Sequence, residues 1–326
     1  MTFIRTVLGD MEPSRLGATY AHEHLVIDGG RPVELYPDFL LADVDRAVEE
    51  LAPAHALGLR AVIDAMPCSA GRNVRKLAEI SRRSGVHVVA PTGLHLAKYY
   101  DPDGWTERAG VAELEAAFTA DVLDGIDEDD YLGPAVRRTR HRAGVVKVAG
   151  SETLTSRERR TFVAAAATHR ATGCPILTHC TDGLGALEQL RLLAGEGVDA
   201  RHVTLSHTDK VVDRGYHREL LGTGAFAEYD QAFRWPEGAP NGTLTLLEWM
   251  IEDGLAGQLM LGMDAARRGY WATYGGAPGM TFLLGEFSDA MRDRGIDEAT
   301  RARLFVANPA RAYAFDGPVD AAHEAA

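Results

Sequence analysis

Short apolar runs alternate with helix-patterned segments along the chain, and this alternation most constrains the fold. Each run is rich in Val, Ile, Leu and Ala, and is followed by a polar loop and a longer segment with helical spacing of apolar residues. The predicted strands cover residues 18–27, 59–65, 86–92, 144–149, 174–180, 201–207, 222–228 and 258–264. Eight strands that alternate with helices favour a closed parallel barrel over an open sheet. We therefore predict an α/β fold of the (β/α)8 TIM-barrel type.

The segments between the strands carry recognisable helix ends. The predicted helices include 43–58, 72–85, 110–124, 156–173 and 183–195. Thr155, followed three residues later by Glu158, resembles a helix start, and Gly85 and Gly173 resemble helix ends. No Gly-x-Gly-x-x-Gly follows the first strand, so a dinucleotide-binding fold has no support.

Length and composition indicate one large globular domain. The chain has 326 residues, of which 46% are hydrophobic and 25% charged, and barrels of this length are routinely one domain. We expect a single domain over 1–326, with an Ala-rich tail that frays after about residue 316. Three cysteines without Cys-x-x-Cys spacing argue against a disulfide framework and a zinc ribbon.

Charge and hydropathy limit the classes of partner that the chain is expected to bind. The net charge of −13, without an evident basic face, disfavours a nucleic-acid binder. No stretch approaches the roughly 20 apolar residues of a membrane span, and the N-terminus lacks the features of a signal peptide. We expect a cytoplasmic protein that acts on a small molecule and binds neither membrane nor nucleic acid.

His22 and His24 are the first sign of chemistry. Side chains alternate along a strand, so two histidines separated by one residue point to the same face. Such a pair is the beginning of a divalent-metal site, although His-x-His also occurs on solvated strands. Glu23 between them points to the other face, where a structural role is expected.

Other polar residues lie where barrel enzymes place their chemistry, at the carboxyl ends of strands. Three further strands end on His179, His207 and Asp264, and Lys147 lies in the middle of an apolar strand. Each histidine alone is more often a hydrogen-bonded structural residue, and Asp264 alone can be a helix N-cap. An ammonium inside an apolar strand is costly unless it is paired or its chemistry changes. Carboxylation by CO2 would convert Lys147 to an anionic carbamate able to bridge two metals.

It is improbable that these six residues occupy five strands in this way by chance. The chain resembles the phosphotriesterase family of the amidohydrolase superfamily. The resemblance covers nearly the whole chain. It lies in the segments 17–24, 145–148, 177–179, 205–209, 261–264 and 308–311.

The resemblance implies a centre of two divalent metal ions. His22, His24 and Asp264 would hold the more buried ion, and His179 and His207 the more exposed one. Carboxylated Lys147 (N6-carboxylysine) and a hydroxide would bridge both. Nitrogen and oxygen ligands suit zinc, which we expect, as well as cobalt, manganese or iron.

The mechanism implied by the resemblance is hydroxide attack. Two cations lower the pKa of a bridging water, and the exposed ion polarises a carbonyl or phosphoryl oxygen. Asp264 is expected to be the catalytic residue that takes the proton and delivers it to the leaving group. Asp209 is either a hydrogen-bond acceptor that orients a metal ligand or an ordinary loop aspartate. His95, after the third strand, is a candidate pocket-lining residue.

Loop residues suggest how a substrate would be held. Tyr99, Arg234, Arg267 and Tyr270 are the candidate substrate-binding residues, because Arg and Tyr in an acidic protein suit an anionic group. The segment 263–271 resembles the lactonase branch, in which Arg267 and Tyr270 would bind a phosphate and Tyr99 would approach the lactone. Relatives with that phosphate site tend to carry a lysine after the loop arginine, whereas Trp235 follows Arg234 here. This departure favours a carboxylate or a neutral lactone.

We therefore predict a phosphotriesterase-like lactonase acting on a sugar lactone, possibly phosphorylated, or an acyl lactone, with organophosphate triester hydrolysis as a side activity. The alternatives are an amidase of N-acyl amino acids or related acids, a primary organophosphate triesterase, and a non-catalytic binding protein. The resemblance also implies a homodimer.

Overall fold

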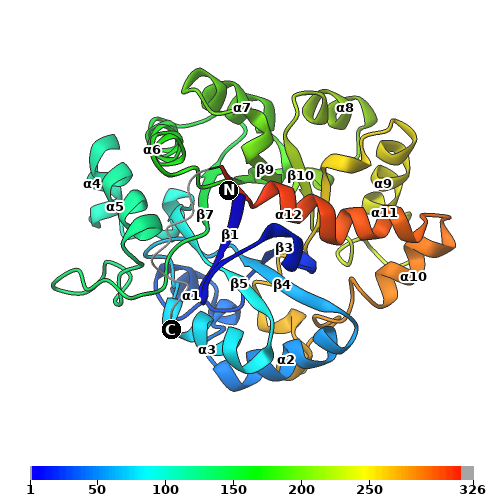
Figure 1. Cartoon of the computed structure of the whole chain (residues 1–326), viewed down its shortest axis with the longest axis horizontal. Coiled ribbons are helices and arrows are strands. Elements are labelled where there is room, and N and C mark those ends of the chain that lie inside the picture. Colours follow the sequence, from blue (N-terminus) through cyan, green and yellow to red (C-terminus); the bar gives the residue numbers. More distant parts are fainter. Residues whose placement is uncertain (1, 317–326) are drawn as a thin grey trace.

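Parallel strands form the centre of the molecule and helices cover its outside (Figure 1). The computed structural model describes residues 2–316. Six strands are hydrogen-bonded in the order β6-β7-β8-β9-β10-β11, and three in the order β3-β4-β5. Only Ala90 separates β5 from β6, and the N–H of Asp264 beyond β11 donates to the carbonyl of His22 in β3 at 2.9 Å. The strands therefore close into the predicted (β/α)8 barrel.

The elements have the following bounds. The strands are β1 Thr2–Thr6, β2 Gly9–Met11, β3 Ala18–Glu23, β4 Leu59–Asp64, β5 His87–Val89, β6 Pro91–Leu94, β7 Val145–Gly150, β8 Ile176–Cys180, β9 Val203–Ser206, β10 Phe226–Tyr229, β11 Leu259–Leu261 and β12 Phe315–Asp316. The helices are α1 Arg31–Leu35, α2 Val44–Ala56, α3 Val74–Ser84, α4 Trp105–Arg108, α5 Val111–Leu123, α6 Ser156–Thr172, α7 Ala186–Gly195, α8 Arg214–Gly222, α9 Gly242–Glu252, α10 Glu286–Asp293, α11 Glu298–Ala302 and α12 Asn308–Ala312.

Two strand predictions need correction, and one pair of strands was not predicted. The strand expected over 86–92 is divided into β5 and β6, because Pro91 has no N–H for a ladder hydrogen bond. The strand expected over 18–27 ends at Glu23, so His24 lies just beyond it. The antiparallel hairpin of β1 and β2, which precedes the barrel, was not predicted.

The predicted helix ends are confirmed. The Thr155 hydroxyl accepts a hydrogen bond from the N–H of Glu158 at 3.2 Å, and the Glu158 carboxylate accepts one from the N–H of Thr155 at 2.9 Å. Gly85 and Gly173 follow α3 and α6 with φ of 72°, a left-handed conformation that favours glycine.

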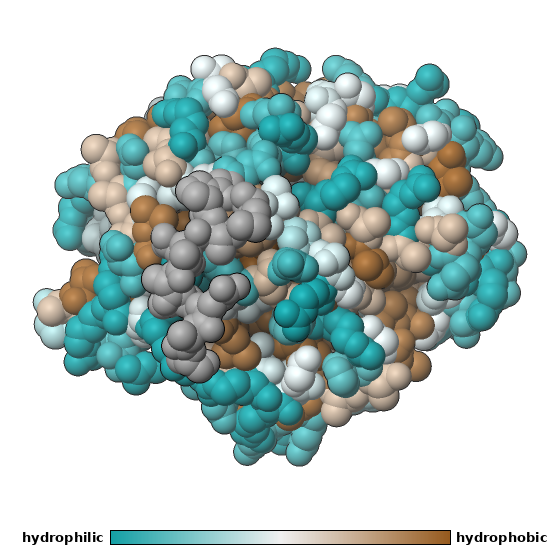
Figure 2. All heavy atoms as spheres, in the orientation of Figure 1, coloured by the Kyte–Doolittle hydropathy of each residue, from teal (hydrophilic) through white to brown (hydrophobic). Residues whose placement is uncertain are grey.

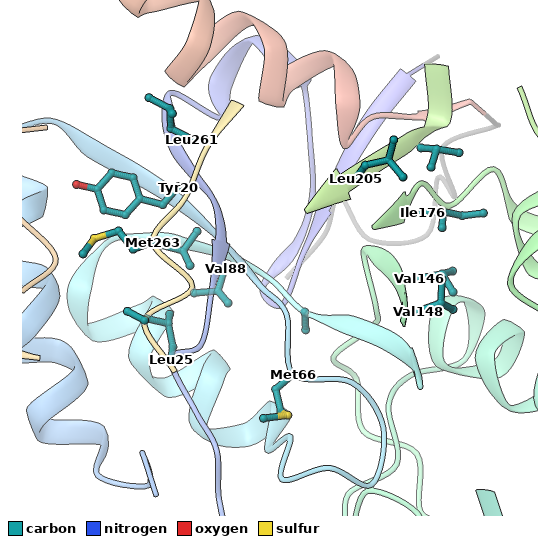
Figure 3. Packing of buried hydrophobic residues seen from close by; sticks show 14 of the residues in the cluster. Tyr20, Leu25, Met66, Val88, Val146, Val148, Ile176, Leu205, Leu261 and Met263 are labelled. Carbon is teal, nitrogen blue, oxygen red and sulfur yellow. The ribbon is translucent and has the colours of Figure 1, made fainter. Parts of the chain in front are cut away.

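Strand residues alternate between the inside of the barrel and the layer under the helices. Val146, Val148, Ile176 and Leu205 belong to the large outer cluster, part of which is drawn in Figure 3. A separate cluster fills the inside of the barrel with Ile4, Leu16, Ala21, Ala61, Ile63, Ala65, Val89, Val145, Leu177, Phe226, Met260, Ala312 and Tyr313. Because Ile4 belongs to β1, the N-terminal hairpin closes one end of the barrel.

The surface seen in Figure 2 is hydrophilic around its rim, with apolar patches between the polar side chains. Among residues 2–316, no helix has both the length and the apolar character needed to span a bilayer. The tail after Asp316, which we expected to fray, lies outside the described residues.

Candidate metal centre

β3 carries the first two predicted ligands. Its register with β4 shifts between Tyr20 and Glu23, an irregularity of the bulge type that redirects side chains. His22 and His24 point into one space, with ring centroids 5.6 Å apart. The Glu23 carboxylate accepts hydrogen bonds from two backbone N–H groups after β11, at 2.7 and 3.2 Å. The two histidines therefore share one space, and Glu23 binds the backbone beyond β11.

Lys147 lies inside the barrel in β7. Its side chain is 1% exposed, and its Nζ has no hydrogen-bond partner within residues 2–316. Burial lowers the pKa of its amine to about 8. Gly93 pairs with Lys147, and a Cβ there would lie 1.9 Å from the Lys147 carbonyl oxygen, so the strand needs glycine. A buried amine without a partner and with a lowered pKa is suited to react with CO2.

His179 and His207 complete the group of histidines. Their ring centroids are 4.4 Å apart, and the His207 ring is 4.9 Å from that of His22. His207 has φ of 65°, an uncommon conformation for histidine that functional sites often hold. Its Nδ1 lies 2.5 Å from Oδ2 of Asp230, which orients the ring.

Asp264 faces the histidines from the end of β11. Its Oδ1 is 3.2 Å from Nε2 of His24 and 3.7 Å from Nε2 of His22, and its backbone has φ of 48°. Burial alone would favour its neutral form. The hydrogen bond to His24 and the charges of His207 and Arg234 nevertheless hold the pKa of Asp264 well below its usual range. The carboxylate is therefore ionised, as a metal ligand must be.

These donor sets fit divalent metal ions. Ligand atoms of His22, His24 and Asp264 lie within 4.8 Å of one another, as do those of His22, His207 and Asp230. Buried Nδ1 of His24 and Nζ of Lys147 have no hydrogen-bond partner within the described chain. Buried polar atoms normally have partners, so unpartnered nitrogens beside these carboxylates indicate room for a cation.

Sequence reasoning missed two carboxylates here. Glu228 of β10 is fully buried, and its Oε2 lies 3.3 Å from Nδ1 of His22. Asp230, for which no role was predicted, contacts His207. The signal was available: inside and outside alternate along β10, so Phe226, Glu228 and Asp230 all point into the barrel.

Asp209, which was either an acceptor that orients a metal ligand or an ordinary loop aspartate, contacts the residues after β10. Its carboxylate accepts hydrogen bonds from the N–H groups of Asp230 and Gln231, at 3.2 and 2.9 Å, and from the Thr243 hydroxyl at 2.6 Å. No contact between Asp209 and a predicted ligand histidine occurs in the described chain. Asp209 holds the backbone of Asp230, and Asp230 contacts His207, a candidate ligand.

A small pocket opens above the histidines. It has a volume of about 90 Å³ and is lined by His22, His24, Pro32, Phe39, Met66, Ala70, His95, Tyr99, His179, His207, Asp264 and Ala266. The candidate pocket residues Tyr99 and His95 are among them. Their rings meet edge to face, with centroids 4.6 Å apart.

The other three substrate-binding candidates have partners elsewhere. Nη2 of Arg234 donates to the Asp264 carbonyl at 2.7 Å, and its guanidinium packs over Tyr270, 5.1 Å from the ring centroid. Arg267 pairs with Asp38 at 2.7 Å and lies over Phe39. None of the three candidates lines the 90 Å³ pocket in this conformation.

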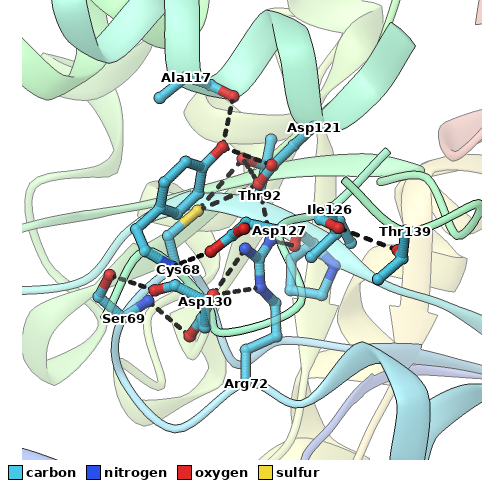
Figure 4. Close-up of polar contacts among 12 residues, drawn as sticks. Cys68, Ser69, Arg72, Thr92, Ala117, Asp121, Ile126, Asp127, Asp130 and Thr139 are labelled. Atoms are coloured by element: carbon cyan, nitrogen blue, oxygen red, sulfur yellow. Dashed lines mark hydrogen bonds and ion pairs between the residues drawn. The ribbon is translucent and has the colours of Figure 1, made fainter. Parts of the chain in front are cut away.

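A buried polar network supports one wall of the pocket (Figure 4). Arg72 binds Asp121 at 2.9 Å and Asp130 at 2.6 Å, and all three side chains are nearly inaccessible. Asp130 also accepts a hydrogen bond from the N–H of Ser69 at 2.7 Å. Ser69 precedes the pocket residue Ala70, so this network fixes the loop after β4.

Barrel and strand-end residues together define a metal-dependent hydrolase. A model of the phosphotriesterase family matches residues 2–313. The phospho-furanose lactonase of Mycoplasmopsis synoviae is 31% identical over 325 residues, which cover 96% of this chain and 92% of that protein. The chain belongs to the phosphotriesterase family of binuclear-metal-dependent hydrolases, and its lactonase and aryldialkylphosphatase relatives indicate a hydrolase acting on ester bonds.

Two solved structures support this assignment. A crystal structure of an amidohydrolase from Mycoplasma synoviae superposes with a TM-score of 0.91 at 30% identity, covering 97% of this chain and 92% of that chain. The lactonase from Listeria monocytogenes gives a TM-score of 0.88 at 28% identity, covering 97% and 100%.

Proposed function

We propose that the protein is a lactonase with a two-metal centre. The observation that carries the proposal is the convergence of four histidines and the Asp264 carboxylate at one small pocket, with the unpartnered Lys147 amine buried close enough to interact with Asp264. Relatives named phospho-furanose lactonase and lactonase support the choice of substrate class. A cavity of about 90 Å³, lined by both polar and apolar side chains, suits a compact ring better than a bulky triester.

His22, His24 and Asp264 are proposed to hold one ion, and His179 and His207 the other, with carboxylated Lys147 between them. The ions, when bound, would supply a nucleophile at neutral pH and polarise the scissile carbonyl. Asp264 would take the proton of the attacking water and return it to the alkoxide that leaves when the ring opens. Arg234 holds the other side of Asp264, its Nη2 lying 3.5 Å from Oδ2, and so keeps the carboxylate oriented.

The identity of the metals and the modification belong to the same proposal. We propose zinc as the native ion and N6-carboxylysine at Lys147, in a cytoplasmic homodimer. Incubation of chelator-treated protein with 13C-bicarbonate and zinc should give a carbamate signal by NMR. Lys147→Met should abolish the signal, and its persistence in that variant would place the carbamate elsewhere.

A substrate panel tests the function. We expect kcat/KM for lactones to exceed that for paraoxon-like triesters and for N-acyl amino acids. A higher value for the triesters would make this a primary triesterase, and a higher value for the N-acyl amino acids would make it an amidase. If no substrate class is hydrolysed and fewer than one metal ion is bound per chain, the results would favour a binding protein.

Phosphorylated and unphosphorylated forms of each lactone should be compared in wild type and Arg267→Ala. Selective loss on the phosphorylated forms would assign Arg267 to the anion. Equal activity on both forms would exclude that assignment.

A further inference from the structure

Once the predicted metal ligands are set aside, few polar side chains remain in the pocket. Its other walls are Pro32, Phe39, Met66, Ala70 and Ala266, all apolar. The two remaining polar groups are the imidazole of His95 and the hydroxyl of Tyr99, both from the loop after β6. Polar groups in an apolar pocket fix the orientation of a ligand and determine specificity.

The hydrogen bonds of His95 define which ring nitrogen carries the proton. Nδ1 accepts a hydrogen bond from the N–H of Leu96 at 2.7 Å, so this nitrogen is unprotonated. The proton of the neutral ring therefore lies on Nε2, which makes no hydrogen bond to any of residues 2–316.

The surroundings hold this ring in place. The N–H of His95 donates to the Tyr100 hydroxyl at 2.7 Å, and its carbonyl accepts a hydrogen bond from Arg157 at 2.8 Å. Its ring packs between Tyr99 and His179, with centroids at 4.6 and 4.8 Å. A donor fixed on a rigid backbone costs little entropy when it binds a ligand.

We propose that Nε2–H of His95 binds a hydroxyl oxygen of the substrate beside the lactone carbonyl, so that the pocket selects hydroxylated, sugar-type lactones over alkyl lactones. This inference rests on the proposed lactonase function. Its physical basis is that a site built to bind a hydroxyl discriminates against the analogue without it, because the donor is then left unpaired.

The test compares one lactone pair across variants. A five-carbon aldonolactone and its deoxy analogue, γ-valerolactone, are assayed with wild type, His95→Phe and His95→Gln. Phe keeps the ring packing and removes the donor, whereas Gln retains an N–H donor. We expect His95→Phe to lower the aldonolactone-to-valerolactone ratio of kcat/KM about 10- to 100-fold, and His95→Gln to restore part of it. Lys98→Ala, an exposed change in the same loop, should keep the wild-type ratio.

Two measurements separate this inference from the proposed function. Metal content should stay equal in wild type and His95→Phe, and its loss would make His95 a metal ligand and overturn the inference. Binding of a hydroxylated γ-lactam and of unsubstituted pyrrolidinone, measured by calorimetry, needs no turnover. If wild type hydrolyses neither lactone, the proposed function fails. The role of His95 then stands if His95→Phe weakens binding of the hydroxylated lactam alone, and falls if both bind unchanged.

Discussion

Two buried polar groups lie close to the same pocket, and they differ in how their charges are matched. Arg72 lies between Asp121 and Asp130, and Asp121 also accepts hydrogen bonds from Thr92 and Tyr131 at 2.9 and 2.6 Å. At the candidate metal centre, the Lys147 amine has no hydrogen-bond partner among residues 2–316. The Arg72 guanidinium is therefore paired with carboxylates of the protein, whereas the Lys147 amine is not.

This difference separates a structural cluster from a functional one. Both groups are removed from water, so burial alone does not distinguish them. A buried charge with matched partners stabilises a local conformation, whereas an unmatched one lowers stability unless a ligand compensates it. The variants below are ordered from the largest expected effect to the smallest.

Lys147→Met should lower kcat/KM by at least about 10³-fold, or about 4 kcal/mol, together with metal content. Chelator-treated Lys147→Met should unfold in urea at the same or higher concentration than chelator-treated wild type, because the amine has no partner to lose. Lys76→Met is the matched control, since Lys76 pairs with Asp28 at 2.8 Å and lies outside the pocket. If metal-free Lys147→Met is clearly less stable than metal-free wild type, the Lys147 amine stabilises the fold, and the proposed difference between the two polar groups is wrong.

Arg72→Met should cost about 3–5 kcal/mol of unfolding free energy, because it leaves buried Asp130 without a cation and leaves Asp121 with Arg138 alone, at 2.7 Å. Urea unfolding with metal analysis checks this. Addition of Asp121→Asn and Asp130→Asn should recover part of the loss. A loss below about 1 kcal/mol would mean that water reaches these carboxylates.

His217 is a buried histidine with partners on both ring nitrogens, so it extends the comparison to a titratable group. Its Nε2 bonds the Val211 carbonyl at 2.9 Å, and its Nδ1 bonds the Tyr229 hydroxyl at 2.8 Å. Burial lowers its pKa from 6.5, so its contribution to stability is present above pH 6.5 and is lost as pH falls through its folded-state pKa. His217→Gln should reduce the loss of stability below pH 6.5 by on the order of 1 kcal/mol. Parallel pH profiles of wild type and variant would exclude this role.

Asp38→Asn tests an arginine–aspartate pair that is not buried. The Asp38 and Arg267 side chains are 47% and 38% exposed, so the change should cost less than about 1 kcal/mol. Release of Arg267 should lower KM for phosphorylated lactones a few-fold if this guanidinium binds the anion. Thermal unfolding and KM on charged and neutral lactones measure the two effects. A stability loss matching that of Arg72→Met would show that exposure does not separate the pairs.

The sequence predicts the barrel and the convergence of the ligand side chains well, because strand alternation and the carboxyl ends of parallel strands determine both. His179 and Lys147 needed only the period of two along their strands. The position of Arg267 was not predictable, since it depends on Asp38, which is 229 residues away along the chain. For the same reason, Asp209 was the candidate for contacting a histidine, whereas Asp230 makes that contact. The local pattern does not reveal which carboxylate a loop turns toward a histidine.

The hairpin that places Ile4 in the barrel has a kinetic consequence. With that end closed, the metal ions, substrate and product of the proposed enzyme would all exchange through the loop end of the barrel. An ion bound beside Lys147 therefore leaves along the route that a bound product occupies. Release of metal to a chelator should slow when product is present, so the enzyme would be protected from demetallation while it turns over.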